Sequence, residues 1–270
     1  MNKDIRPILV VGSPRSGTTL IGNYIGSAAP VANLGEYGGF FLAYHIAPSQ
    51  LVRLPSTCKN EYLAAVQEHA AAFARSRAKS SRQRFFLDST PWNLLIATRL
   101  AEHLENAVFV LVLRHYAGVL QSLQRSYTAG YEWAGKCWAD RARLWQAFYL
   151  NAMLLPSERT IVTSYDSVCA APQEAIDSLD KELASYEIRN LDRREFTRSH
   201  ATNLEQARQT VGYLDARRVR FRAISSFDAT HWSEEIEREV LPLVHSTDML
   251  LRERFSTYYR APVSFSGHVG

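Results

Sequence analysis

Residues 8–20 read ILVVGSPRSGTTL: a short apolar run, a loop bounded by Gly12 and Gly17, and the start of a helix. This order is typical of a phosphate cradle, because the N–H groups of the loop and of the first helical turn point into one concavity. The two glycines permit a tight path and a close approach of the backbone to a phosphate. Thr18 and Thr19 are expected to add hydroxyl donors at the same rim. The segment therefore predicts a phosphate-binding turn.

The two glycines have the spacing of the nucleoside-triphosphatase loop G-x-x-x-x-G-K-[ST], but Thr18 stands where that loop has its lysine. The cation of this loop is Arg15, which precedes the second glycine. This arrangement disfavours an enzyme that must neutralise β- and γ-phosphates with a lysine. It favours a donor whose charged, reacting group lies near the middle of the loop.

Short runs that are apolar on both faces predict the strands of a buried parallel sheet, at residues 8–11, 85–87, 108–113 and 160–163. Segments with helical periodicity separate or follow them, at residues 17–27, 61–78, 92–104, 116–127, 133–155 and 233–254. The last of these begins at Ser233, which is followed by acidic residues as at a capped helix start. The pattern predicts one α/β domain over residues 1–270, with a mostly parallel sheet flanked by helices and a helix-rich C-terminal third.

A second candidate phosphate contact comes from Arg114 and Ser122. The longest apolar strand ends in Arg114, which places this arginine at the ligand-facing edge of a parallel sheet. Ser122 lies two turns into the next helix and can turn towards the same place. Together they can offer one phosphate a charge-assisted and a neutral hydrogen bond. The alternative is a surface arginine and an ordinary helical serine.

These segments resemble PAPS-dependent sulfotransferases, where PAPS is 3′-phosphoadenosine 5′-phosphosulfate. Residues 14–20, PRSGTTL, look like the family's 5′-phosphosulfate loop, and Arg114 with Ser122 looks like its 3′-phosphate motif. A third segment, residues 163–168, resembles the one whose tyrosine lies beside the adenine or the 3′-phosphate. The resemblance spans roughly residues 8–180 and implies a sulfotransferase fold of the P-loop NTPase type. It implies that PAPS is held by Pro14, Arg15, Ser16, Gly17, Thr18, Thr19, Arg114, Ser122 and Tyr165.

Sulfuryl transfer needs in-line geometry, stabilisation of charge on the moving group, and a base for the acceptor hydroxyl. Arg15 is expected to act electrostatically, because an arginine is not a general acid at neutral pH. Glu36 is the preferred base, since several sulfotransferases with this loop place a catalytic glutamate just after the first helix. The rival bases are His45, Asp88 and His115.

The chain departs from the family at Ser89, where a lysine that touches the transferring sulfuryl group often stands. This departure suggests a second hypothesis, a PAPS-binding homologue with weak turnover. Arg218, Arg220 and Arg222 alternate along the chain and are expected either to close over the nucleotide or to face solvent. A stripe at helical spacing is expected to be core first and acceptor pocket second: Trp138, Ala142, Trp145, Tyr149 and Ala152.

The composition adds limits to these expectations. A formal net charge of +4 suits anionic small molecules but is too small to imply nucleic acid. Three scattered cysteines and eight scattered histidines suggest neither a disulfide framework nor a metal site. The chain contains no apolar stretch of membrane-spanning length, and its first residues do not read as a signal peptide, so a cytoplasmic protein is expected.

The sequence thus predicts an enzyme that moves the sulfuryl group of PAPS to a hydroxyl, or an amine, by in-line transfer with Glu36 as base and without a metal. The acceptor is expected to be a small molecule, a carbohydrate or a lipid, and a homodimer remains open. A phosphate-loop kinase is the rival enzyme class, and it predicts dependence on Mg²⁺.

Overall fold

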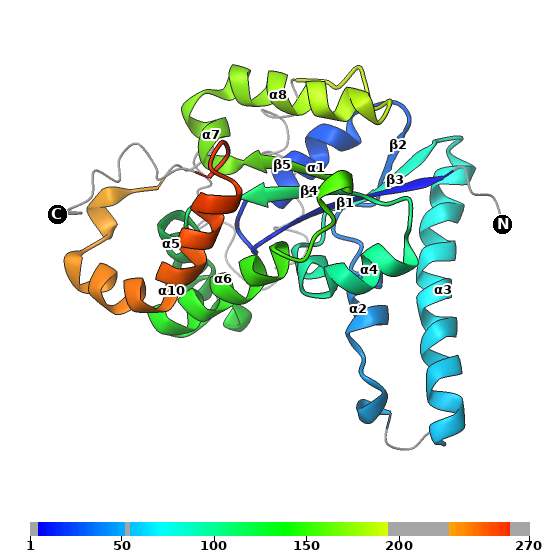
Figure 1. Ribbon diagram of the computed structural model, residues 1–270, viewed down its shortest axis with the longest axis horizontal. Coiled ribbons are helices and arrows are strands. Elements are labelled where there is room, and N and C mark those ends of the chain that lie inside the picture. Colours follow the sequence, from blue (N-terminus) through cyan, green and yellow to red (C-terminus); the bar gives the residue numbers. More distant parts are fainter. Residues whose placement is uncertain (1–4, 52–54, 194–226, 260–270) are drawn as a thin grey trace.

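A computed structural model of the chain describes residues 5–51, 55–193 and 227–259. Its centre is a sheet of five parallel strands in the order β2-β3-β1-β4-β5 (Figure 1). The strands are β1 (Arg6–Gly12), β2 (Val31–Asn33), β3 (Phe85–Asp88), β4 (Val108–Leu113) and β5 (Thr160–Ser164). The four strands predicted from the apolar runs are confirmed. The edge strand β2 was not predicted, because its three residues include the polar Asn33 and do not form an apolar run.

Helices cover both faces of this sheet. The α-helices are α1 (Thr18–Gly26), α2 (Gly39–His45), α3 (Ser56–Ser80), α4 (Ala97–His103), α5 (Tyr116–Thr128), α6 (Trp138–Ala152), α7 (Tyr165–Ala170), α8 (Pro172–Ser185) and α10 (Glu234–Arg254). The 3₁₀ helices are η1 (Pro48–Gln50), η2 (Pro91–Ile96), η3 (Glu132–Ala134), η4 (Ser157–Arg159) and η5 (Ala229–His231). In Figure 1, α1 and α8 lie above the sheet and α4 and α6 below it, while α3 projects beyond it beside α2.

The alternation of side chains along each strand divides the core into two layers. Ile8 and Val10 of β1 pack with α1, α7 and α8, whereas Leu9 and Val11 pack with the helices of the opposite face. All six residues of β4 are buried. This is the pattern of a parallel strand covered on both sides, and it confirms the α/β class predicted from the sequence.

The strand register brings the carboxyl ends of the strands to one edge of the sheet. Ile8 of β1 pairs with Leu87 of β3 and with Val108 of β4. At the next pair, Leu113 of β4 lies opposite Ser164 of β5. The segments that follow these strands therefore meet at the same edge, which is where open parallel sheets bind their ligands.

Two predicted helices differ from those observed. The helix expected over residues 133–155 is broken at Gly135, whose φ of 86° is outside the helical region, and α6 begins at Trp138. The helix expected over residues 92–104 is divided in two: it starts as the 3₁₀ helix η2, whose first residue is Pro91, and continues as α4. The capped start of α10 is confirmed, since the Ser233 hydroxyl accepts the N–H of Ile236 at 3.3 Å.

Four members of the aromatic and alanine stripe on α6 are fully buried, as expected for core: Ala142, Trp145, Tyr149 and Ala152. Among the described residues, no helix combines the length and apolar character needed to cross a membrane. The predicted basic segment with Arg218, Arg220 and Arg222 lies outside the described residues.

Candidate active site

The phosphate loop connects β1 to α1 in a conformation that few residue types adopt. Arg15 has a φ of 72° and Gly17 a φ of 97°, both in the left-handed region. The turn is closed by a hydrogen bond of 3.0 Å from the N–H of Ser16 to the carbonyl of Ser13. Gly17 occupies the N-cap of α1 and has no side chain to cap it, so the N–H groups of the first turn remain available to an anion.

The side chains of the loop divide between the interior and the rim. Ser16 and Thr18 are buried, and both lie close to the position that a Cβ on Gly12 would take. Pro14 is buried as well, whereas Thr19 is half-buried and Arg15 is exposed. What Ser16 and Thr18 can offer an anion is therefore their backbone, while Arg15 and Thr19 present side chains.

Arg114 joins the end of β4 to the phosphate loop. Its side chain is 3% exposed, and its Nη1 donates to the carbonyl oxygen of Arg15 at 2.7 Å. The indole N–H of Trp145 donates to the Arg114 carbonyl at 3.3 Å, and the Arg114 N–H donates to the Tyr149 hydroxyl at 3.0 Å. Two buried aromatic residues of α6 thus hold the backbone from which this guanidinium extends.

Tyr165 completes this side of the cradle from the end of β5. The Arg114 guanidinium lies over its ring at 4.2 Å from the centroid, within the range of a cation–π interaction. The same ring lies against Gly17, where an added Cβ would come within 2.4 Å of Cδ2. The next residue, Asp166, accepts the N–H of His115 at 2.7 Å, which ties the start of α7 to the end of β4.

Ser122 brings the two predicted phosphate motifs together. Its hydroxyl accepts the Nε–H of Arg15 at 3.1 Å, across a sequence separation of 107 residues. The structure therefore brings the loop, Arg114, Ser122 and Tyr165 together in one cluster at the carboxyl edge of the sheet.

A third arginine, Arg125, belongs to this group and was missed by the sequence reasoning. It lies one helical turn beyond Ser122 on α5, and residues three apart share a helix face, which is the signal that could have found it. Its side chain is exposed, but the surrounding protein and then the charge of Arg114 lower its pKa. Arg125 therefore adds positive potential to the site.

The three guanidinium groups repel one another. Although Arg15 meets solvent at the mouth of the site, the protein around it and then the charges of Arg114 and Arg125 lower its pKa. Glu36 and Tyr131 act in the opposite direction. An anion bound among these arginines would relieve this repulsion, so the electrostatics fit a ligand with several negative charges.

Glu36 lies at the rim of the loop, on the segment between β2 and α2. Its Oε1 accepts the hydroxyl hydrogen of Thr19 at 2.8 Å. The carboxylate is exposed and is directed to the first turn of α1 by this contact. This contact places the carboxylate beside the phosphate loop.

Two rival bases are buried. Asp88 is 0% exposed, and it accepts hydrogen bonds from the Thr90 N–H and hydroxyl and from Asn93. His115 is 0% exposed, burial lowers its pKa to about 3, and its ring caps the start of α5 by accepting from Ala117. Neither group reaches an acceptor at the mouth of the site.

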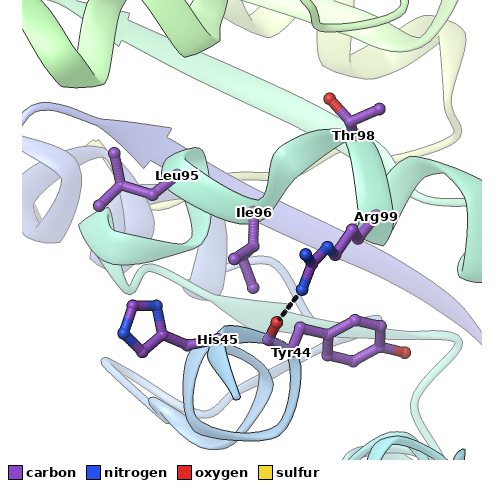
Figure 2. Close-up of a pocket in the computed structure, with 6 residues that line it drawn as sticks. All are labelled: Tyr44, His45, Leu95, Ile96, Thr98 and Arg99. Carbon is purple, nitrogen blue, oxygen red and sulfur yellow. Dashed lines mark hydrogen bonds between the residues drawn. The ribbon is translucent and has the colours of Figure 1, made fainter. Parts of the chain in front are cut away.

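The third rival base, His45, lies elsewhere. It is exposed, stacks on Phe41 with ring centroids 4.7 Å apart, and lines a hollow of about 300 Å³ (Figure 2). Figure 2 shows Arg99 donating to the Tyr44 carbonyl across this hollow, at 2.7 Å. The lining residues come from α2, η2 and α4 rather than from the phosphate loop: Tyr44, His45, Leu95, Ile96, Thr98 and Arg99.

Ser89, at the position of the frequent family lysine, is buried against α1. A Cβ added to Gly22 would come within 2.6 Å of the Ser89 Cβ. The serine therefore supplies no cation, and the described cations of the site are those of Arg15, Arg114 and Arg125. The described residues also hold no cluster of three or more His, Cys, Asp or Glu side chains that could bind a metal ion.

Comparison with known proteins agrees with this fold and site. Residues 7–183 match the model of the sulfotransferase family, and the chain therefore belongs to that family. This confirms the family and the class of enzyme predicted from the sequence. No curated protein sequence matches the chain significantly.

Two solved structures share the fold over almost the whole chain. One is the sulfotransferase domain from the curacin biosynthetic pathway, with a TM-score of 0.50, 14% identity, and coverage of 94% of this chain and 98% of that one. The other is the sulfotransferase domain from the Synechococcus PCC 7002 olefin synthase, with a TM-score of 0.52, 13% identity, and coverage of 95% and 96%. The predicted α/β sulfotransferase fold is thereby confirmed.

Proposed function

We propose that this sulfotransferase takes its sulfuryl group from PAPS and transfers it to a hydroxyl, or an amine, of a small-molecule, carbohydrate or lipid acceptor. The observation that carries the proposal is the contact of Arg15 with both Arg114 and Ser122, at 2.7 and 3.1 Å. It joins a loop suited to a 5′-phosphosulfate to a pair suited to a 3′-phosphate. ATP has no 3′-phosphate to satisfy the second pair.

In this proposal the chain's own residues divide the work. The first turn of α1 and the loop backbone hold the 5′ end of the donor, and Arg114, Ser122 and Tyr165 hold its nucleotide end, with Arg125 as a further cation. Arg15 stabilises the charge that develops between donor and acceptor, since it extends from the loop into the mouth. Bound PAPS supplies an activated sulfuryl group with an adenosine bisphosphate leaving group.

Glu36 accepts the proton of the acceptor hydroxyl in this scheme. Thr19 holds Oε1 of the carboxylate at the rim of α1, which leaves Oε2 to face an acceptor. General-base catalysis by a positioned carboxylate contributes about 10²- to 10⁴-fold to the rate.

Tyr131 and Trp133 offer the acceptor an aromatic surface next to the site. Tyr131 lies close enough to Arg15 to influence its pKa, and its ring centroid is 6.0 Å from that of Trp133. These two side chains are 36% and 42% exposed. We propose that the acceptor approaches along this side, because exposed aromatic side chains beside a polar site are typical of ligand surfaces.

Ser89 favours a second candidate, a homologue that binds PAPS but turns over weakly. The buried serine leaves the sulfuryl group without the lysine that many relatives place there. The two candidates differ in one result: product formed across a broad acceptor panel supports the enzyme, and donor binding without product supports the homologue. A phosphate-loop kinase is disfavoured by Thr18 in the lysine position and by the buried, fully hydrogen-bonded Asp88.

The first test is calorimetric binding of 3′,5′-adenosine bisphosphate and of ADP without added metal. We expect micromolar affinity for the bisphosphate, no comparable affinity for ADP, and a loss of at least tenfold in Arg114→Ala, because a charge-assisted hydrogen bond is worth about 1.5–3 kcal/mol. Arg143→Ala, which removes an exposed arginine of α6, is the matched control. Preference for ADP, or a need for Mg²⁺, would refute the PAPS proposal.

A further inference from the structure

The segment that carries Glu36 is attached to the end of β3 by three backbone groups. The Leu34 N–H donates to the Leu87 carbonyl at 2.9 Å, and the Ser89 N–H donates to the Gly35 carbonyl at 2.8 Å. On the other side of Glu36, the Gly38 N–H donates to the Thr90 hydroxyl at 2.9 Å. The glutamate thus lies between two anchored points.

The Thr90 hydroxyl connects this segment to a buried carboxylate. It donates to Oδ1 of Asp88 at 2.6 Å, and because its one hydrogen is used there, it meets Gly38 as an acceptor. Asp88 also accepts from the Thr90 N–H at 2.9 Å and from Nδ2 of Asn93 at 2.8 Å, and the backbone of Tyr37 adds a further hydrogen bond. Burial raises the pKa of Asp88, and these hydrogen bonds oppose the rise.

These polar anchors matter because packing does little to hold the turn at its two glycines. Gly35 and Gly38 have φ values of 63° and 68°, and among the described residues, apart from each glycine's two chain neighbours, no atom lies within 4 Å of the Cβ that either would carry. Glu36 itself is exposed. At both glycines the turn is therefore held by hydrogen bonds, while between them the Tyr37 ring stacks on Phe73 with ring centroids 5.5 Å apart.

We propose that Thr90, oriented by Asp88, is a positioning residue for Glu36: it fixes the turn so that the carboxylate stays beside Thr19 at the mouth of the site. This inference rests on the proposed role of Glu36 as the base. It also gives a different role to the buried Asp88, which the sequence indicated as a rival base. The Asp88 carboxylate acts through Thr90 and Gly38 and does not contact the acceptor.

The test compares Thr90→Val and Thr90→Ser in the full-length protein. Valine has the shape of threonine without the hydroxyl, whereas serine keeps the hydroxyl. We expect Thr90→Val to lower kcat with PAPS and the best acceptor of a panel by about tenfold to a hundredfold, the scale of a small displacement of a catalytic group. Thr90→Ser should restore most of this loss. The affinity for 3′,5′-adenosine bisphosphate should stay within about twofold, since Thr90 lies outside the arginine cradle.

A double-mutant cycle with Glu36→Gln separates positioning from general stability. If Thr90 acts through Glu36, Thr90→Val lowers kcat little further once Glu36 has been replaced. Thr98→Val, at an exposed threonine of α4, is the matched control.

Equal kcat for Thr90→Val and wild type, with Glu36→Gln slow, would refute the positioning role and leave the proposed base intact. Full additivity of the two changes would refute it as well. Equal kcat for Glu36→Gln and wild type would refute the proposed base and with it the role of Thr90. If the wild-type protein does not bind 3′,5′-adenosine bisphosphate, the PAPS proposal is refuted independently of Thr90.

Discussion

At the scale of single residues, Arg15 links most of the site by itself. Its carbonyl accepts from Arg114, its Nε donates to Ser122, and its charge interacts with that of Glu36. A non-glycine residue at a φ of 72° costs about 1–2 kcal/mol, so these contacts hold a backbone conformation that arginine does not prefer. The strain lies at the position where the proposed sulfuryl group would be held.

Substitution of Arg15 separates its charge from its shape. Arg15→Ala is expected to slow sulfuryl transfer about 10²- to 10³-fold, as for other preorganised donors to a transition state. Arg15→Lys should lie between Ala and wild type, because lysine keeps the charge but loses the planar guanidinium that reaches Ser122. Release of 3′,5′-adenosine bisphosphate from PAPS is the measurement. Equal rates for Lys and wild type would show that charge alone is needed.

At the scale of elements, the cradle depends on the close approach of α7 to the start of α1. The Tyr165 ring lies against Gly17, and the Arg114 guanidinium from the end of β4 lies over the same ring at 4.2 Å from its centroid. The junction of β1 with α1 therefore serves both as a turn with a positive φ and as a packing surface. A glycine is needed there for both reasons.

Gly17→Ala is expected to weaken bisphosphate binding by at least tenfold and to lower the free energy of unfolding by about 1–3 kcal/mol. The strain of a positive φ and the contact with Tyr165 act together in this variant. Gly38→Ala has a similar positive φ but open space around its Cβ, so it should lower stability by about 1 kcal/mol and leave bisphosphate affinity unchanged. Urea denaturation and calorimetry provide the two measurements. Similar bisphosphate affinities for both variants would contradict the packing argument.

At the scale of the whole molecule, α10 packs against α6, and its Asp248 comes within 4.0 Å of the buried His115 that follows β4. The charges that act on the imidazole ring are those of Asp248 and Arg252, both on α10. Tyr259 donates to Asp248 at 2.7 Å, and Arg252 donates to its other oxygen at 2.7 Å. Burial outweighs the attraction of Asp248 and lowers the pKa of His115 to about 3.

This burial predicts a loss of stability in mild acid. Below an ordinary histidine pKa of about 6.5 the unfolded chain binds a proton that the folded protein does not. The free energy of unfolding therefore decreases as the pH is lowered from about 6.5 to 3. From pH 7 to pH 5 the histidine alone contributes a loss of about 2 kcal/mol in the free energy of unfolding. His115→Asn, which keeps a capping side chain, should remove this part of the pH dependence. Urea denaturation of both proteins at pH 7 and pH 5 measures this effect. An equal change in the free energy of unfolding between the two pH values for both proteins would contradict the prediction.

Much of the fold was predictable from local patterns, and so were the segments that carry the candidate site, but the contacts between these segments were not. The runs that became β1, β3, β4 and β5 are apolar enough to be recognised, whereas β2 contains the polar Asn33 and α2 lies directly behind a glycine-rich turn. The phosphate loop and Arg114 were predicted because each follows a strand. Arg125 was not predicted, because a lone arginine inside a helix is usually a surface residue.

The sequence by itself determined that the chain forms a parallel α/β sheet with a phosphate loop behind its first strand, since apolar periodicity and glycine spacing act over a few residues. Only the tertiary structure decided that Arg15 meets Ser122, that Tyr165 lies against Gly17 and that Asp88 supports the Glu36 segment through Thr90. These contacts join residues that are far apart in the chain. They depend on strand register and on how the crossover helices pack, and neither is encoded in a local pattern.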